Sequence, residues 1–188
     1  MHLLVALLLG ATHLPGEARS VSASAPPAQA VPEREAFHRA LRAIEEEDSS
    51  PLGRLRVLYH RAVLDSDELT RAERSLARIE PGERSSPLLL AYEGALEVLR
   101  AAHGWWPLRH LRPGIGVLDR AVETAPSDPE VRYLRLVSEV HLPVAFRRDD
   151  VVRRDLAVLR DLLRDRHSLS PSMEKLIAAF VAAEVGRL

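Results

Sequence analysis

The chain has 188 residues, which is enough for one domain with a sizeable core and short for two. It is 46% hydrophobic and 28% charged, a composition typical of a globular protein rather than a disordered one. The formal net charge of -1 gives no electrostatic argument for binding nucleic acid or a membrane surface. Because cysteine is absent, disulfides, thiolate metal sites and a cysteine nucleophile are excluded.

Residues 1–30 have the pattern of an export signal. Leu3–Leu9 is a short apolar run, and Ala28–Ala30 supplies a small-x-small motif with cleavage predicted before Val31. The apolar run is well below the ~20 residues that a membrane-spanning helix needs. Because the first residues contain no lysine or arginine, a frayed hydrophobic N-terminus is the alternative. The sequence therefore predicts a signal peptide followed by one domain over 31–188, in a periplasmic or secreted protein.

Four prolines mark predicted helix starts along the rest of the chain. Each follows a serine or an aspartate, whose side chain can accept a hydrogen bond from an unpaired N–H of the first turn. Proline is tolerated there because its missing N–H would have had no partner. The pairs are Ser50-Pro51, Ser86-Pro87, Asp128-Pro129 and Ser170-Pro171, and their prolines are 36, 42 and 42 residues apart. A recurrence of this length is typical of two-helix repeats.

Apolar residues recur every three or four positions within each interval, which indicates amphipathic helices. The helix over 88–102 is apolar almost all round and is therefore predicted to be the most buried. No stretch alternates apolar and polar residues for long enough to predict a strand. The sequence thus predicts an all-α solenoid of about eight antiparallel helices, with helical segments around 33–48, 55–62, 69–79, 88–102, 115–125, 131–141, 152–163 and 173–181.

Two short patterns in the middle of the chain are spaced as in a known helical repeat. They consist of Tyr92, Gly94 and Ala95 in one helix, then Ala121 and Pro126 at the end of the next, and Asp128, Pro129 and Glu130 opening a third. Together they make 87–140 resemble a tetratricopeptide (TPR) repeat, although the 42-residue spacing exceeds the usual ~34. The usual Trp and Leu positions are not clearly matched. The resemblance implies a non-catalytic scaffold that binds a protein or peptide and carries no cofactor.

The most binding-like composition lies at the corner between two predicted helices, over 103–112. Both tryptophans of the protein are there beside arginines, and aromatic faces next to positive charge can hold an anionic ligand. If the helices stack as repeats, arginines of the following helix could share one face with this corner. The ligand-binding candidates are therefore Tyr92, Trp105, Trp106, Arg109, Arg112, Arg132 and Arg135. The structural alternatives are a loop pinned by buried indoles and a salt-bridged helix surface.

A second hypothesis gives the protein an enzymatic or metal-binding accessory role. Glu93 and Glu97 are four residues apart on the apolar helix, and His103 and His110 flank the corner. Paired carboxylates serve general acid–base chemistry only if burial separates their pKa values. The simpler interpretation is an outward helix edge salt-bridged to arginines such as Arg100. No histidine pair has the spacing of a zinc-binding motif, so no metal site is assigned.

The last predicted helix is apolar over too wide an arc for the end of an open array, because nothing stacks beyond a terminal helix. One apolar stripe can cover the preceding helix, and the remainder must fold back into the domain or contact another chain. Ile177, Phe180 and Val181 are the candidates for such an interface. The sequence therefore predicts either a homodimer through this helix or the docking of a partner helix.

Overall fold

The computed structural model describes residues 30–80, 82, 85–103, 107–142, 145–165 and 167–185. Over these ranges the protein is all-α, with eight helices and no strand, as the sequence predicts. No helix among them is long and apolar enough to cross a membrane. The helices are α2 (Ala30–Glu47), α3 (Pro51–Leu64), α4 (Ser66–Ala77), α5 (Pro87–His103), α6 (Pro107–Thr124), α7 (Pro129–Val140), α8 (Asp149–Leu162) and α9 (Pro171–Val185).

All four predicted proline starts are confirmed, and each preceding residue caps its helix. Ser50 accepts from the Gly53 N–H at 3.1 Å, and Asp128 accepts from the N–H groups of Glu130 and Val131. The two remaining caps are longer contacts, from Ser86 to the Leu89 N–H and from Ser170 to the Met173 N–H. These caps pair N–H groups that would otherwise have no partner in the first turn.

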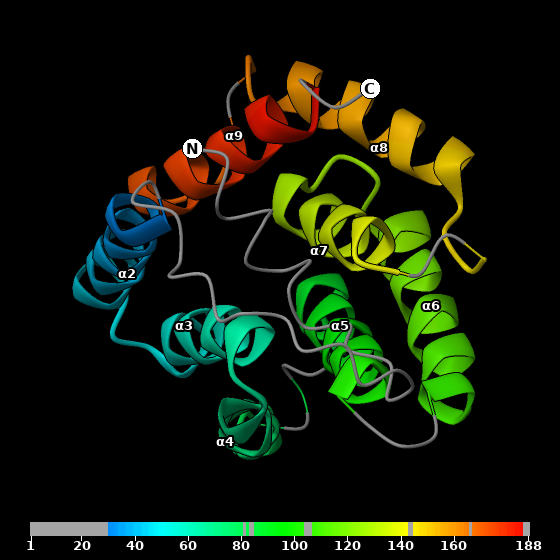
Figure 1. Ribbon diagram of the computed structural model, residues 1–188, viewed down its shortest axis with the longest axis horizontal. Coiled ribbons are helices and arrows are strands. Elements are labelled where there is room, and N and C mark those ends of the chain that lie inside the picture. The colour runs from blue at the N-terminus through cyan, green and yellow to red at the C-terminus, as the bar shows by residue number, and fades with distance from the viewer. Residues whose placement is uncertain are drawn as a thin grey trace, which may run out of the picture.

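The helices pack in sequence order and then return to the start. The neighbouring pairs α3/α4, α5/α6 and α7/α8 contact each other, and α7 also lies against α5 (Figure 1). The last helix, α9, packs on both α8 and α2, so the two ends of the helical array meet. Glu47 at the end of α2 fixes this closure by accepting from Ser172, from the N–H at 3.0 Å and the hydroxyl at 2.6 Å.

The most buried helix is α7, so the prediction that the helix over 88–102 would be most buried is wrong. Every residue from Pro129 to Glu139 is buried, whereas the helix α5 keeps a partly exposed edge. The buried stretch of α7 contains four charged side chains, which made the helix look amphipathic. Their charges are paired inside the fold, and pairing is the condition under which charged side chains are found buried.

Two glycines bring α5 and α6 into close contact. A Cβ atom on Gly94 would lie 2.9 Å from the carbonyl oxygen of Gly114, and one on Gly114 would lie 2.8 Å from that of Gly94. Side chains at these positions would push the helix backbones apart. Gly94 of α5 and Gly114 of α6 thus form a small-residue contact between the two helices.

The three interface candidates in α9 are core residues. Ile177, Phe180 and Val181 are at most 5% exposed, and the Phe180 ring lies edge-on to Tyr133 of α7 at 5.4 Å between centroids. The apolar arc expected to be free is covered, because α2, α7 and α8 supply the neighbouring core residues. The sequence leaves two possibilities for the apolar surface of this helix, packing within the domain or contact with another chain. Ile177, Phe180 and Val181 pack within the domain.

Candidate functional site

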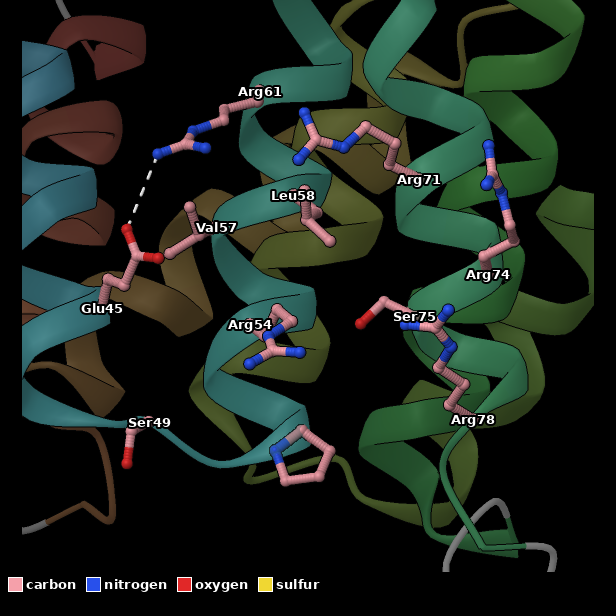
Figure 2. Close-up of a pocket in the computed structure, with 11 residues that line it drawn as sticks. Glu45, Ser49, Arg54, Val57, Leu58, Arg61, Arg71, Arg74, Ser75 and Arg78 are labelled. Atoms are coloured by element: carbon pink, nitrogen blue, oxygen red, sulfur yellow. Dashed lines mark ion pairs between the residues drawn. The ribbon is translucent and has the colours of Figure 1, made fainter.

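A cleft of about 640 Å³ opens over α3, between α2 on one side and α4 on the other (Figure 2). We refer to it as the arginine cleft. Val57, Leu58 and Ser75 form its buried floor, and Glu45 lies on the α2 side. Its five arginines are Arg54 and Arg61 from α3 and Arg71, Arg74 and Arg78 from α4 and its C-terminal cap. The cleft therefore sets five positive charges against one negative charge.

The geometry of the cleft follows from the very short connection between α3 and α4 and from the regular spacing of arginines along both helices. Asp65 alone separates α3 from α4, and its side chain caps α4 by accepting from the Asp67 N–H at 2.9 Å. This forces the two helices side by side. The α3 arginines are seven residues apart and those of α4 are three and four apart, so each set lies on one helix face.

Most of the positive charge in the cleft is not neutralised within the described residues. Arg54, Arg74 and Arg78 are exposed, and no carboxylate in the described ranges pairs with them. Arg61 reaches toward Glu45 at 3.6 Å between Nη2 and Oε2, as Figure 2 shows. Arg71 pairs with Glu68 at 2.8 Å while 60% of its side chain is exposed. Ion pairs whose arginine is in contact with solvent contribute little stability, so Arg61 and Arg71 can exchange partners.

The floor of the cleft is anchored to the core by a buried ion pair on the opposite face of α3. The Arg56 guanidinium donates to both carboxylate oxygens of Glu130 in α7, at 2.8 and 2.6 Å, and to Asp48 at 2.7 Å. The Tyr92 hydroxyl donates to the same Glu130 at 2.7 Å. Tyr92 is completely buried, so this ligand-binding candidate is part of the scaffold behind the cleft.

His60 extends this polar cluster inside the core. Its Nδ1 lies 2.7 Å from the Arg56 carbonyl oxygen, which can only accept, so Nδ1 carries the proton. Its Nε2 lies 3.1 Å from the Tyr133 hydroxyl, which donates to it. Burial lowers the pKa of His60 to about 4, because a charged imidazolium would lose its water. The residue is a neutral core histidine near pH 7.

Arg132 and Arg135, two further ligand-binding candidates, are buried and form ion pairs inside the fold. Both donate to Asp155 of α8 at 2.7 Å, and Arg135 also reaches Asp119 at 3.0 Å. Burial raises the pKa of Asp119, but hydrogen bonds and charge from Arg148 and Arg135 hold it below its usual value. These contacts hold α6, α7 and α8 together.

The four residues of the enzymatic hypothesis do not form one cluster. The His110 Nδ1 lies 2.8 Å from Glu97, which also pairs with Arg100, as the simpler interpretation expects for that glutamate. His103 contacts the Ala62 carbonyl oxygen at 3.1 Å instead, and Glu93 is exposed. The described residues contain no group of three or more side chains that could hold a metal ion. The hypothesis of catalysis or metal binding stays a prediction.

The part of the corner that holds both tryptophans, 104–106, lies outside the described residues. Arg109 and Arg112 of the same corner are exposed on α6. Structure does not bring them to the arginine cleft, whose lining comes from α2, α3 and α4. The sequence analysis did not predict the cleft because it used only the apolar residues of α3 and α4. The regular spacing of arginines on the polar faces of these two helices is the sequence feature that indicates it.

Comparison with protein-family models, with curated proteins and with solved structures gives no match to this chain.

Proposed function

We propose that the protein is an exported, non-catalytic scaffold of TPR-like helical repeats that binds a protein or peptide segment in the arginine cleft. The observation that carries this proposal is the cleft itself. It has about 640 Å³ of space, a partly apolar floor and five arginines, three of which have no carboxylate partner in the described chain. Clefts of this size with a few convergent polar groups are common binding sites.

The surrounding fold supports binding rather than chemistry at this place. The cleft lining contains arginines, one glutamate, two serines and apolar residues, and it contains no histidine that could act as a general base near pH 7. The anchoring of α3 through Arg56 and Glu130 holds the floor rigid. A pre-formed site loses less conformational entropy when a ligand binds, which favours affinity.

Export is the second part of the proposal. The segment 1–30 lies outside the described residues apart from Ala30, and the expected cleavage before Val31 coincides with the beginning of α2. Expression with the native N-terminus should therefore yield envelope or medium protein that starts at or near Val31. N-terminal sequencing tests this, and soluble cytoplasmic protein with an intact Met1 would contradict it.

The binding proposal is tested on an array of short peptides of varied composition. Peptides that bind the full chain are then measured against the double variant Arg54→Gln/Arg78→Gln. Because both side chains are exposed and lack described carboxylate partners, we expect this variant to stay folded but to lose affinity. The control is Arg153→Gln/Arg154→Gln, which removes the same charge from the exposed face of α8. No bound peptide, or equal binding by both variants, would refute the proposal.

A further inference from the structure

Resting on the proposed function, we infer that the occupant of the arginine cleft is an extended polypeptide segment carrying a run of acidic residues. Five arginines and a single glutamate line the cleft. Three of the arginines have no carboxylate partner in the described chain, and Arg61 and Arg71, each with one carboxylate partner, are themselves 36% and 60% exposed. A guanidinium presents a planar fork of donors that matches a carboxylate, and such charge-assisted bonds are about twice as strong as neutral ones.

The arginines are spread out along the cleft and do not converge on one point. Arg54 and Arg61 are seven residues apart on α3, and Arg71 and Arg78 are seven apart along α4, which corresponds to about 10 Å at 1.5 Å per helical residue. An extended peptide rises about 3.3 Å per residue, so about four residues cover this length. Several carboxylates along a strand fit these two rows, whereas a single phosphate would reach only part of one.

The floor of the cleft also favours a peptide over nucleic acid. Val57 and Leu58 line the cleft and are nearly buried, Val57 on the side of α3 that faces Glu45 and Leu58 on the side that faces α4 (Figure 2), so they offer narrow apolar contacts to the backbone and stems of an extended chain. Proteins that bind single-stranded nucleic acid stack its bases on aromatic side chains. None of the cleft-lining residues is aromatic.

Glu45 marks the place that a ligand carboxylate would take. Its Oε2 lies 3.6 Å from the Arg61 guanidinium, and the two side chains are 59% and 36% exposed. An exposed pair of this length is weak, so an incoming carboxylate can replace it. Removing the Glu45 charge takes away both a competitor for Arg61 and a like charge facing the ligand. Glu45→Gln therefore binds an acidic peptide more tightly than the natural protein does.

The test compares labelled peptides of about six residues. One contains a glutamate run, a second has glutamine at each of those positions, and a third has one phosphoserine in the glutamine background. Fluorescence anisotropy with the full chain should give affinity in the order glutamate, phosphoserine, glutamine. We expect about a tenfold loss from glutamate to glutamine, which four weak ion pairs are sufficient to produce. Raising the salt concentration should reduce the difference.

Two variants test whether the peptide binds in the arginine cleft, and a third variant on α8 serves as the control. Arg54→Gln/Arg78→Gln should lose most of the preference for glutamate, Glu45→Gln should strengthen it, and Arg153→Gln/Arg154→Gln should leave it unchanged. Equal affinity for the glutamate and glutamine peptides would overturn the inference, and so would tightest binding of the phosphoserine peptide. If array peptides of other composition still bound through Arg54 and Arg78, the proposed function would stand without it. If a single-stranded oligonucleotide outcompeted the glutamate peptide, a nucleic-acid site would replace the inference.

Discussion

Arg56 on α3 and Glu130 on α7 form a two-point ion pair across 74 residues of sequence, with donor–acceptor distances of 2.8 and 2.6 Å. The Glu130 side chain is 3% exposed, and Tyr92 of α5 donates to the same carboxylate. This contact ties the floor of the arginine cleft to the most buried helix. The cleft is therefore supported by the core rather than by the α3/α4 pair alone.

Replacing Glu130 with alanine should destabilise the fold strongly. The change leaves the buried Tyr92 hydroxyl without its acceptor and removes two of the three carboxylate contacts of Arg56, which keeps only Asp48. Breaking a buried pair in this way costs about 3–5 kcal/mol. Urea unfolding followed by circular dichroism measures the loss. Arg71→Ala is the control because the Arg71 side chain is 60% exposed in its pair with Glu68, and we expect the change to cost less than about 1 kcal/mol. Equal losses in the two variants would show that the Glu130 pair is not structural.

The number of helices and the four starts at Ser-Pro or Asp-Pro could be predicted from sequence because their signals are local. The start of α6 at Pro107 was not predicted: no serine or aspartate precedes this proline, and a corner was expected over 103–112 with the helix around 115–125. A serine or aspartate before proline, as at Ser50 and Asp128, encodes a helix start within a few residues. The burial of α7 could not be predicted in this way. It depends on Asp155 of α8 for Arg132 and Arg135, and on Arg56 of α3 for Glu130, which are partners outside the helix itself.

The close contact between Gly94 and Gly114 predicts opposite effects for two glycine substitutions. Gly94→Ala should destabilise by about 1–3 kcal/mol, because its Cβ would lie 2.9 Å from a carbonyl oxygen and the helices must separate. Gly116→Ala should stabilise by about 0.5–1 kcal/mol, since nothing lies within 4 Å and alanine favours a helix. Thermal unfolding of both variants tests whether the first loses stability and the second gains it. A stabilised Gly94→Ala would contradict the observed helix contact.

His60 predicts a loss of stability in mild acid. Its folded pKa of about 4 lies below the unfolded value of about 6.5, so the unfolded chain binds a proton first as the pH falls. Protonation of His60 therefore has no effect on the free energy of unfolding above about pH 6.5 and lowers it by about 3 kcal/mol near pH 4. Urea titrations between these values measure it. His60→Gln should be less stable at pH 7.5, but its free energy of unfolding should change less between pH 6.5 and pH 4. An unchanged pH dependence would show that His60 does not cause the loss of stability in acid.

Phe180 should behave as a core residue rather than as an interface residue. Phe180→Ala removes a ring that is 2% exposed and should cost about 3–5 kcal/mol of stability. Val185→Ala on the same helix is the control, because Val185 is 40% exposed and should tolerate the change. Light scattering run alongside unfolding separates the two roles. A Phe180→Ala protein of full stability but altered mass would restore the interface hypothesis.

The arginine cleft illustrates a second limit of the sequence. Arg71, Arg74 and Arg78 reveal a charged helix face by spacing alone, but a charged face is usually a solvated surface. Only the one-residue connection at Asp65 turns that face toward Arg54 and Arg61. Tyr92 and Arg132 illustrate the converse limit, because these side chains have the composition of a binding site but are buried and hydrogen-bonded to Glu130 and Asp155 inside the fold.

The most direct test of the binding account is to find where an acidic peptide lies on the protein. A glutamate peptide with one photoreactive residue at its centre is cross-linked to the full chain, and the attachment sites are mapped by mass spectrometry. The account predicts attachment at cleft residues of α3 and α4, such as Leu58 and Ser75, and its loss when unlabelled glutamate peptide competes. Competable attachment elsewhere, on α8 or at the α6 corner around Arg109, would contradict the account.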